Sequence, residues 1–243
     1  MPKRRRPRFV ALVDELRRRL PDLDDPAGAI RARGVRVDGS IMTSTSARVR
    51  ADASIVVRPT PTRRGAGKLR AALEAFALDV RDRVALDVGA ASGGFTEVLL
   101  AAGASRVYAV DAGHGQLAGR LRQHERVVNL ERVNVGRLDR VLVPDVVDVI
   151  TIDLSYLALA SALPQIEAID IAADADLVAL VKPMFELRAA ALPSPDGVAE
   201  AVARVERALR HGRWVGCGSI ESPVRGHGGA VEWFVHARRS AEA

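Results

Sequence analysis

The sequence predicts an α/β protein with a mostly parallel sheet whose last strand is antiparallel, preceded by a small α+β module. From about residue 64 onward, apolar segments of strand length alternate with helix-compatible segments, the pattern of a parallel sheet with helical crossovers. A glycine cluster in Leu-Asp-Val-Gly-Ala-Ala-Ser-Gly-Gly-Phe-Thr at 86–96 predicts a strand, a tight turn and a helix. We therefore expect a module at 1–58, a linker with two prolines at 59–63 and a larger domain at 64–243.

The N-terminal module is predicted to combine two helices with three short strands. Apolar residues recur at helical spacing between 9 and 20, with Arg17, Arg18 and Arg19 between them, which predicts a basic amphipathic helix. The following elements are a short helix over 26–33, a hairpin over 35–41 with an Asp-Gly turn, and a strand over 54–57.

The larger domain begins with a predicted helix over 64–77 that carries Lys68 in its first turns. Predicted strands follow at 84–88, 106–110, 126–130, 146–152, 176–181, 214–220 and 231–237, and the last two form an antiparallel pair. Ligands bind at the carboxyl edge of an open parallel sheet, and an antiparallel strand begins at that edge. Asp153, Lys182 and Glu232 are therefore expected there, beside the glycine turn and Lys68. A buried ion-pair network without a function would use the same four residues.

Basic residues are unevenly distributed in both position and type. Residues 1–70 carry a net charge of +11 and the remainder −5, so a polyanion such as nucleic acid is the expected partner, the alternative being a solvated basic face. Of 36 basic residues only Lys3, Lys68 and Lys182 are lysine. An ammonium group can donate or accept a proton whereas a guanidinium group effectively cannot. Lys68 and Lys182 are therefore candidates for chemistry, although chance survival of two lysines would look the same.

Several classes of protein are disfavoured by composition. Asp or Pro interrupts every long apolar stretch, and no apolar segment follows the basic start, so we expect neither a membrane span nor a signal peptide. A single cysteine, Cys217, excludes an internal disulfide, and the five histidines lack metal-ligand spacing, so no metal site is expected. These features predict a cytoplasmic protein.

The glycine turn favours one nucleotide cofactor over another. A dinucleotide fingerprint requires G-x-G-x-x-G, but Gly89 is followed by Ala91 at the second position, and only Gly94 meets the third. Asp87 would repel a pyrophosphate and suit an ammonium group, and Asp111, about one βα unit later, could hold a ribose. S-adenosylmethionine, which has an ammonium, a sulfonium and no phosphate, fits better than a dinucleotide. The remaining alternative is a glycine turn that binds nothing.

With these positions in view, the chain resembles the TlyA family, also called hemolysin A, within the FtsJ-like ribosomal RNA methyltransferases. The likeness is carried by "RRGAGKLRAAL", "LDVGAASGGFTEVLLAAGA", "VYAVDAGHGQLAGRLR", "VVNLERVNV", "ITIDLSYLAL", "LVALVKPMFE" and "SPVRGHGGAVEWFVHAR". In addition, "RGVRVDGS" in the N-terminal module resembles the S4 RNA-binding domain. The resemblance implies a Rossmann-like class I methyltransferase sheet behind an S4-like domain, with S-adenosylmethionine as the methyl donor.

The resemblance also implies roles for individual residues. A Lys-Asp-Lys-Glu tetrad for 2′-O-methylation of structured RNA, such as ribosomal RNA or a ribosomal subunit, falls on Lys68, Asp153, Lys182 and Glu232. The implied cofactor contacts are Asp87, Gly89, Ala90, Ser92, Gly93, Gly94, Phe95, Asp111, Asn134 and Asp153. The basic residues expected to contact RNA are Arg17, Arg18, Arg19, Arg63 and Arg64.

Two departures from the family pattern leave other functions open. The segment 187–197 is rich in alanine and proline where the family usually has glycines and a lysine, and Gly67 replaces a common aromatic residue. The alternatives are a non-catalytic RNA-binding or ribosome-assembly protein with a vestigial methyltransferase domain, and a methyltransferase for a small molecule.

Overall fold

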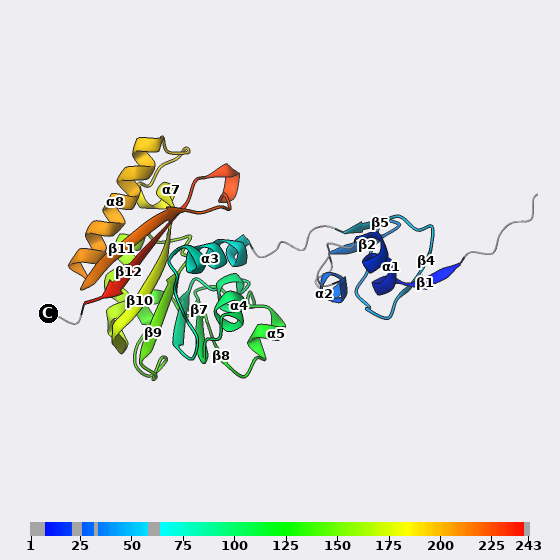
Figure 1. Ribbon diagram of the computed structural model, residues 1–243, viewed down its shortest axis with the longest axis horizontal. Coiled ribbons are helices and arrows are strands. Elements are labelled where there is room, and N and C mark those ends of the chain that lie inside the picture. Colours follow the sequence, from blue (N-terminus) through cyan, green and yellow to red (C-terminus); the bar gives the residue numbers. More distant parts are fainter. Residues whose placement is uncertain (1–7, 21–25, 32–33, 58–63, 241–243) are drawn as a thin grey trace, which may run out of the picture. The chain divides into compact units, whose positions relative to one another are not determined.

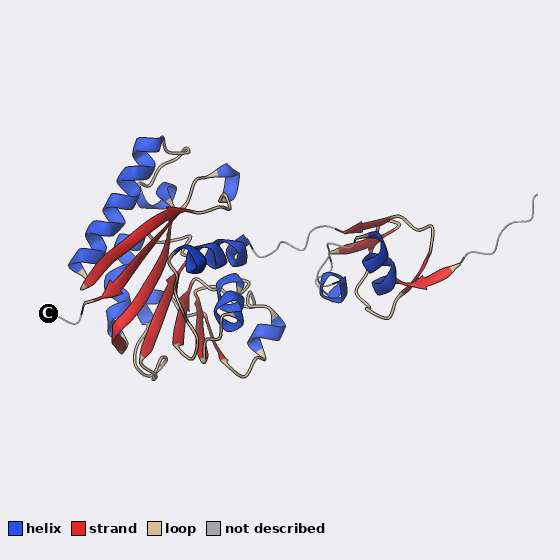
Figure 2. Ribbon diagram, in the orientation of Figure 1, coloured by secondary structure: helices blue, strands red, loops and turns tan. Residues whose placement is uncertain are grey.

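A computed structural model describes residues 8–20, 26–31, 34–57 and 64–240. Contacts divide the chain into two compact units, Met1–Thr62 and Arg63–Ala243. Figure 1 colours both units along the sequence from blue to red, and Figure 2 distinguishes their helices from their strands. None of the helices in the described ranges is long and apolar enough to cross a membrane.

The N-terminal unit packs two helices against short strands. Its elements are β1 (Phe9–Ala11), α1 (Leu12–Arg19), α2 (Pro26–Arg31), β2 (Val35–Val37), β3 (Ser40–Ile41), β4 (Arg48–Arg50) and β5 (Ile55–Val57). Strand β2 lies between β3 and β5, and β1 pairs antiparallel with β4. Leu12, Leu16, Ile30 and Val35 are fully buried in its core.

The hairpin of this unit follows the prediction, whereas its first helix begins later than predicted. Asp38 and Gly39 both have positive φ, 47° and 82°, as the tight Asp-Gly turn requires. Phe9 was expected on the first helix but lies in β1 and is half exposed. The cause is the pairing of β1 with β4, after which the helix begins at Leu12.

The C-terminal unit is a seven-stranded sheet in the order β11-β12-β10-β9-β6-β7-β8. Its strands are β6 (Val84–Val88), β7 (Arg106–Asp111), β8 (Val127–Glu131), β9 (Val147–Ile152), β10 (Ile171–Val181), β11 (Trp214–Glu221) and β12 (Trp233–Arg239). Strands β6 to β10 are parallel, and β12 is antiparallel to both of its neighbours. The predicted fold class is confirmed. Only β10 differs by more than two residues from prediction, because it begins at Ile171 and contains an irregular register before Asp176.

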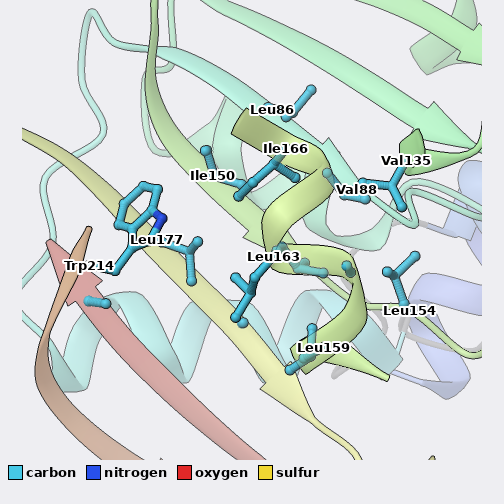
Figure 3. Close-up of a cluster of buried hydrophobic side chains, with 14 of the residues drawn as sticks. Leu86, Val88, Val135, Ile150, Leu154, Leu159, Leu163, Ile166, Leu177 and Trp214 are labelled. Atoms are coloured by element: carbon cyan, nitrogen blue, oxygen red, sulfur yellow. The ribbon is translucent and has the colours of Figure 1, made fainter. Parts of the chain in front are cut away.

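Helices cover both faces of this sheet (Figure 2). They are α3 (Arg64–Ala75), α4 (Gly94–Ala101), α5 (Gly119–Arg122), η1 (Val135–Arg137), α6 (Leu159–Ala162), η2 (Leu163–Ala168), α7 (Pro183–Glu186), α8 (Pro195–His211) and η3 (His227–Gly229). Residues of α3, α4 and α5 share one buried cluster with the sheet, and residues of α6, η2 and α8 share the other. Figure 3 shows side chains of the second cluster, in which Leu163 lies beside Leu177 and Ile166 lies beside Ile150.

The order of the strands fixes where a ligand can bind. From β6 the chain continues outward through β7 to β8, and then returns to β9 on the other side of β6. The loops after β6 and β9 therefore diverge, and open α/β sheets bind ligands in such a crevice. The glycine turn follows β6, and Asp153 follows β9.

Candidate active site at the carboxyl edge of the sheet

Two lysines form ion pairs with the two carboxylates predicted to lie beside them. Lys182 Nζ is 2.5 Å from Asp153 Oδ1 and donates a hydrogen bond to Ser155 Oγ at 2.8 Å. Lys68 Nζ forms an ion pair and hydrogen bond with Glu232 Oε2. The structure thus pairs all four residues, Lys182 with Asp153 and Lys68 with Glu232.

Strand register explains why three of these residues share one edge. Asp153 comes directly after β9, and Lys182 directly after β10. Glu232 directly precedes β12, which runs antiparallel to β10 with Val181 opposite Trp233. The residues that flank this register pair therefore lie at the carboxyl edge of the parallel strands. Helix α3 supplies Lys68.

The two ion pairs differ in their access to solvent. The side chains of Lys68 and Glu232 are 7% and 6% exposed, whereas those of Lys182 and Asp153 are 14% and 22% exposed. A Cβ atom at Gly226 would lie 2.2 Å from Glu232 Oε1, so the loop approaches this carboxylate more closely than any side chain would permit. The buried pair therefore suits a positioning role, and the partly open pair suits contact with a substrate.

The glycine turn is built against the backbone at Asp153. Gly89 has φ of 88°, and a Cβ atom there would lie 2.3 Å from the carbonyl oxygen of Asp153. Asp153 N in turn donates to Val88 O at 2.9 Å. Gly93, at the N-terminus of α4, has φ of 92°. Glycine at 89 is thus required both by its backbone conformation and by the close approach of the next loop.

Asp111 holds the turn from the end of β7. Its Oδ2 accepts a hydrogen bond from Ala91 N at 2.8 Å, and its Oδ1 accepts one from Gly113 N at 2.6 Å. Glu131, at the end of β8, accepts hydrogen bonds from the backbone N–H groups of Gln116 and Leu117. Backbone hydrogen bonds, chiefly from Leu117, lower the pKa of Glu131 to about 2. Sequence reasoning missed Glu131, whose position at a strand end next to Asp111 was the available signal.

Asp87 lies beneath the turn, with its carboxylate inside the protein. Its side chain is fully buried and accepts hydrogen bonds from Thr96 Oγ1 at 2.6 Å and Thr151 Oγ1 at 3.1 Å. Burial raises the pKa of the Asp87 carboxyl to about 7, although the two threonines oppose that shift. This geometry links β6 to α4 and β9.

The other predicted cofactor contacts divide between the surface and the core. Ser92 and Asn134 are exposed, whereas Ala90, Gly93, Gly94 and Phe95 are buried. Phe95 packs in the core, with its ring centroid 6.1 Å from that of Phe234. Phe95 thus supports the turn from the core, and Ser92 and Asn134 have side chains accessible to a ligand.

The predicted RNA-contacting arginines have different environments. Arg19 donates to Glu15 and to the carbonyl oxygens of Ala51 and Ala53, so it holds the N-terminal unit together. Arg18 donates two hydrogen bonds to Glu15 while remaining 67% exposed. Arg17 is 66% exposed, with Asp14 at 3.5 Å. Arg63 and the side chain of Arg64 lie outside what the structure describes.

The chemistry of the edge fits a cationic nucleoside ligand better than an anionic one. Asp111 and Asp153 place carboxylates on two sides of the glycine turn, and Lys182 is already paired with Asp153. Carboxylates accept hydrogen bonds from ribose hydroxyls and attract positive charge. S-adenosylmethionine matches that set, with Asp111 and Asn134 able to hold its nucleoside part. Within the described ranges, no three His, Cys, Asp or Glu side chains are placed to hold a metal ion.

Comparison with known proteins also indicates a methyltransferase. The sequence profile of the FtsJ-like methyltransferases matches residues 62–239. The 16S/23S rRNA (cytidine-2′-O)-methyltransferase TlyA of Mycobacterium tuberculosis is 40% identical over 227 residues, which cover 89% of this chain and 84% of that protein. A solved structure named "putative hemolysin" from Streptococcus thermophilus has a TM-score of 0.71 at 26% identity, covering 96% of this chain and 89% of the other.

A more distant solved structure shares the fold alone. It is an S-adenosylmethionine-dependent methyltransferase from Mesorhizobium loti, with a TM-score of 0.52 at 14% identity. The match covers 70% of this chain and 96% of that one. A class I methyltransferase sheet is therefore the architecture on which the candidate active site is built.

Proposed function

The chain belongs to the FtsJ-like methyltransferase family, and we propose that it transfers a methyl group from S-adenosylmethionine to a ribose 2′-hydroxyl of ribosomal RNA. The observation that carries this proposal is the pair of lysine–carboxylate contacts, Lys182 with Asp153 and Lys68 with Glu232, at the edge that also holds the glycine turn. The methyltransferase of M. tuberculosis that is 40% identical acts, by its name, on this class of substrate.

Lys182 is the residue that we expect to bind the nucleophile, the ribose 2′-oxygen. S-adenosylmethionine supplies an electrophilic methyl group on a sulfonium. The ribose oxygen must approach that carbon to about 3 Å. The new carbon–oxygen bond forms as the carbon–sulfur bond breaks, and the proton of the hydroxyl passes to solvent, which reaches the partly exposed Lys182 and Asp153. Lys182 Nζ, held by Asp153 and Ser155, binds the 2′-oxygen and stabilises the negative charge that develops there. Ser155 is a further polar contact that the sequence prediction missed, although a hydroxyl two residues after Asp153 was its signal.

The other members of the tetrad position the reacting groups and do not contact the 2′-oxygen themselves. Asp153 orients the Lys182 ammonium group and lies against the glycine turn, so it links nucleophile and donor. The buried pair of Lys68 and Glu232 fixes α3 to the start of β12. Asp111 and Asn134 hold the nucleoside of the methyl donor, while Asp87 keeps α4 and β9 in place beneath it.

RNA is the proposed partner of the N-terminal unit. This part of the chain carries most of the excess positive charge and resembles the S4 RNA-binding domain. The structure favours Arg17 over Arg19 as a phosphate contact, because Arg19 is committed to Glu15 and two carbonyl oxygens. A ribosomal substrate would place the protein in the cytoplasm.

Methyl transfer to purified ribosomal subunits and free ribosomal RNA tests the proposal. Lys182→Ala is expected to reduce transfer from labelled S-adenosylmethionine by on the order of 100-fold or more, because the group that binds the nucleophile is lost. Binding of S-adenosylmethionine, measured by calorimetry, should change little. Arg140→Ala, at the opposite edge of the sheet, serves as the control and should retain activity.

Two results would contradict the proposal. Undiminished transfer by Lys182→Ala would remove this lysine from the reaction. RNA binding by the wild-type protein without any binding of S-adenosylmethionine would instead favour a ribosome-assembly protein with a vestigial methyltransferase domain. Mapping of 2′-O-methyl groups in ribosomal RNA from cells with and without the gene would identify the modified nucleotide.

A further inference from the structure

Glu186 is a buried carboxylate for which the reaction described above has no use. It is the last residue of α7, four residues after Lys182, and it is 1% exposed. Burial raises the pKa of its carboxyl, against opposing hydrogen bonds from the backbone at Leu159 and Ala160. Glu186 Oε2 has no hydrogen-bond partner among the described residues. A buried acidic group with one unpaired oxygen is unfavourable for stability, so its position calls for another explanation.

The contacts of Glu186 connect the two loops that form the Lys182 site. Its Oε1 accepts a hydrogen bond from Leu159 N at 2.5 Å, at the end of the loop that begins with Asp153 and Ser155. Its own backbone N–H donates to Lys182 O at 3.1 Å. One residue therefore bonds both to the backbone of Lys182 and to the far end of the segment that holds the Lys182 ammonium group.

Neighbouring contacts hold both Glu186 and the ends of the loop in place. Leu154 and Leu159 are buried at the two ends of the loop, where Figure 3 shows both side chains in the core cluster. Arg204 of α8 donates to Glu186 O at 3.1 Å. Between those ends, Ser155 and Tyr156 are exposed. The hydrogen bond from Leu159 N to Glu186 therefore anchors the end of the exposed loop segment to the protein core.

We infer that Glu186 is a positioning residue for methyl transfer. It holds the loop so that Asp153 Oδ1 and Ser155 Oγ stay in contact with Lys182 Nζ. This inference rests on the proposed function for its kinetic consequence. Loss of the Leu159 contact would free the loop, lengthen the Lys182–Asp153 and Lys182–Ser155 contacts and misplace the 2′-oxygen. A misplacement of about 1 Å can reduce the rate of a positioned reaction by on the order of 100-fold.

Two substitutions separate the acceptor oxygen from the charge. Glu186→Gln keeps a carbonyl oxygen for Leu159 N, whereas Glu186→Met has similar length without an acceptor. The methionine variant is expected to lose on the order of 10- to 100-fold in kcat with KM for RNA nearly unchanged, and the glutamine variant should stay within about threefold of wild type. Val205→Ala, a buried change on α8, controls for lost stability: it should lower the melting temperature and retain kcat.

Amide hydrogen exchange over residues 153–162 provides a readout that is independent of activity. Exchange should accelerate in Glu186→Met and not in Glu186→Gln or Val205→Ala, because only methionine leaves Leu159 N without its acceptor. Wild-type kcat in the methionine variant, or equal loss of kcat in both Glu186 variants, would overturn the inference. If the wild-type protein transfers no methyl group, the proposed function fails, and hydrogen exchange alone tests whether Glu186 holds the loop. Unchanged exchange in Glu186→Met would then show that the Glu186–Leu159 hydrogen bond does not hold it.

Discussion

Replacement of Asp87 by asparagine is expected to remove a pH dependence from the free energy of unfolding. The Asp87 carboxyl is fully buried, and burial raises its pKa from 3.8 to about 7. The folded state therefore binds a proton more tightly than the unfolded state. Stability from this group is fully present below about pH 3.8 and is lost as the pH rises toward about 7. A shift of about three pH units corresponds to about 4 kcal/mol as an upper estimate.

The magnitude can be measured between two pH values. At pH 5 the wild-type protein has lost only about a third of this free energy through Asp87, and at pH 8 it has lost the full amount. The difference in unfolding free energy between Asp87→Asn and wild type should therefore move by about 3 kcal/mol in favour of asparagine from pH 5 to pH 8. Titrating groups that do not interact with Asp87 contribute equally to both proteins and cancel.

Urea unfolding followed by tryptophan fluorescence is the appropriate assay, because both tryptophans, Trp214 and Trp233, lie in the C-terminal unit. Asp170→Asn, which removes a half-exposed carboxyl that is paired with Arg140, controls for the change in net charge. A difference between Asp87→Asn and wild type that is equal at the two pH values would refute the reasoning. So would a difference that grows in favour of wild type as the pH rises.

Two further predictions concern the turn and the N-terminal unit. Gly89→Ala should lower the free energy of unfolding by more than about 1 kcal/mol and weaken binding of S-adenosylmethionine in calorimetry. The reason is that the new Cβ would meet Asp153 O and that the φ angle at this position is positive. Gly119→Ala, which has open space around it, should have neither effect. Arg19→Ala should lower the melting temperature of the N-terminal unit, because three acceptors lose their donor. Arg17→Ala should instead leave melting unchanged and reduce the salt dependence of RNA binding by about one charge; the reverse pattern would contradict this assignment.

The sheet and its carboxyl edge could be predicted from the sequence because they depend on short-range patterns. Apolar runs of strand length alternate with helical segments, and parallel connections of this kind have few topologies. Once the strands are placed, the residues after them must share an edge. Asp153 and Lys182 could therefore be assigned to one edge before their contact was known.

Contacts between distant segments could not be predicted in this way. Strand β1 pairs with β4 across nearly 40 residues. The three apolar residues of β1 continue into the helical pattern that follows, and β4 has a single apolar residue between two arginines, so neither segment alone indicates a strand. Glu186 is similar, because its partner at Leu159 lies 27 residues earlier on a different loop. Nothing in the local sequence distinguishes an acidic residue that ends a short helix from one that binds across the fold.

A shift of a single residue along a strand decides which carboxylates face the ligand. Asp87, Asp111 and Asp153 all come near the ends of neighbouring parallel strands, and the sequence gives them equal claims on the cofactor. However, β6 continues to Val88, so Asp87 is one residue inside the strand. Successive strand side chains point to opposite faces, and Asp87 consequently meets Thr96 and Thr151 in the interior. Asp111, the last residue of β7, and Asp153, the first after β9, lie where their carboxylates border the turn. We therefore propose that Asp111 and Asp153 supply the negative charge that faces the methyl donor, with the buried Asp87 fixing the turn between them.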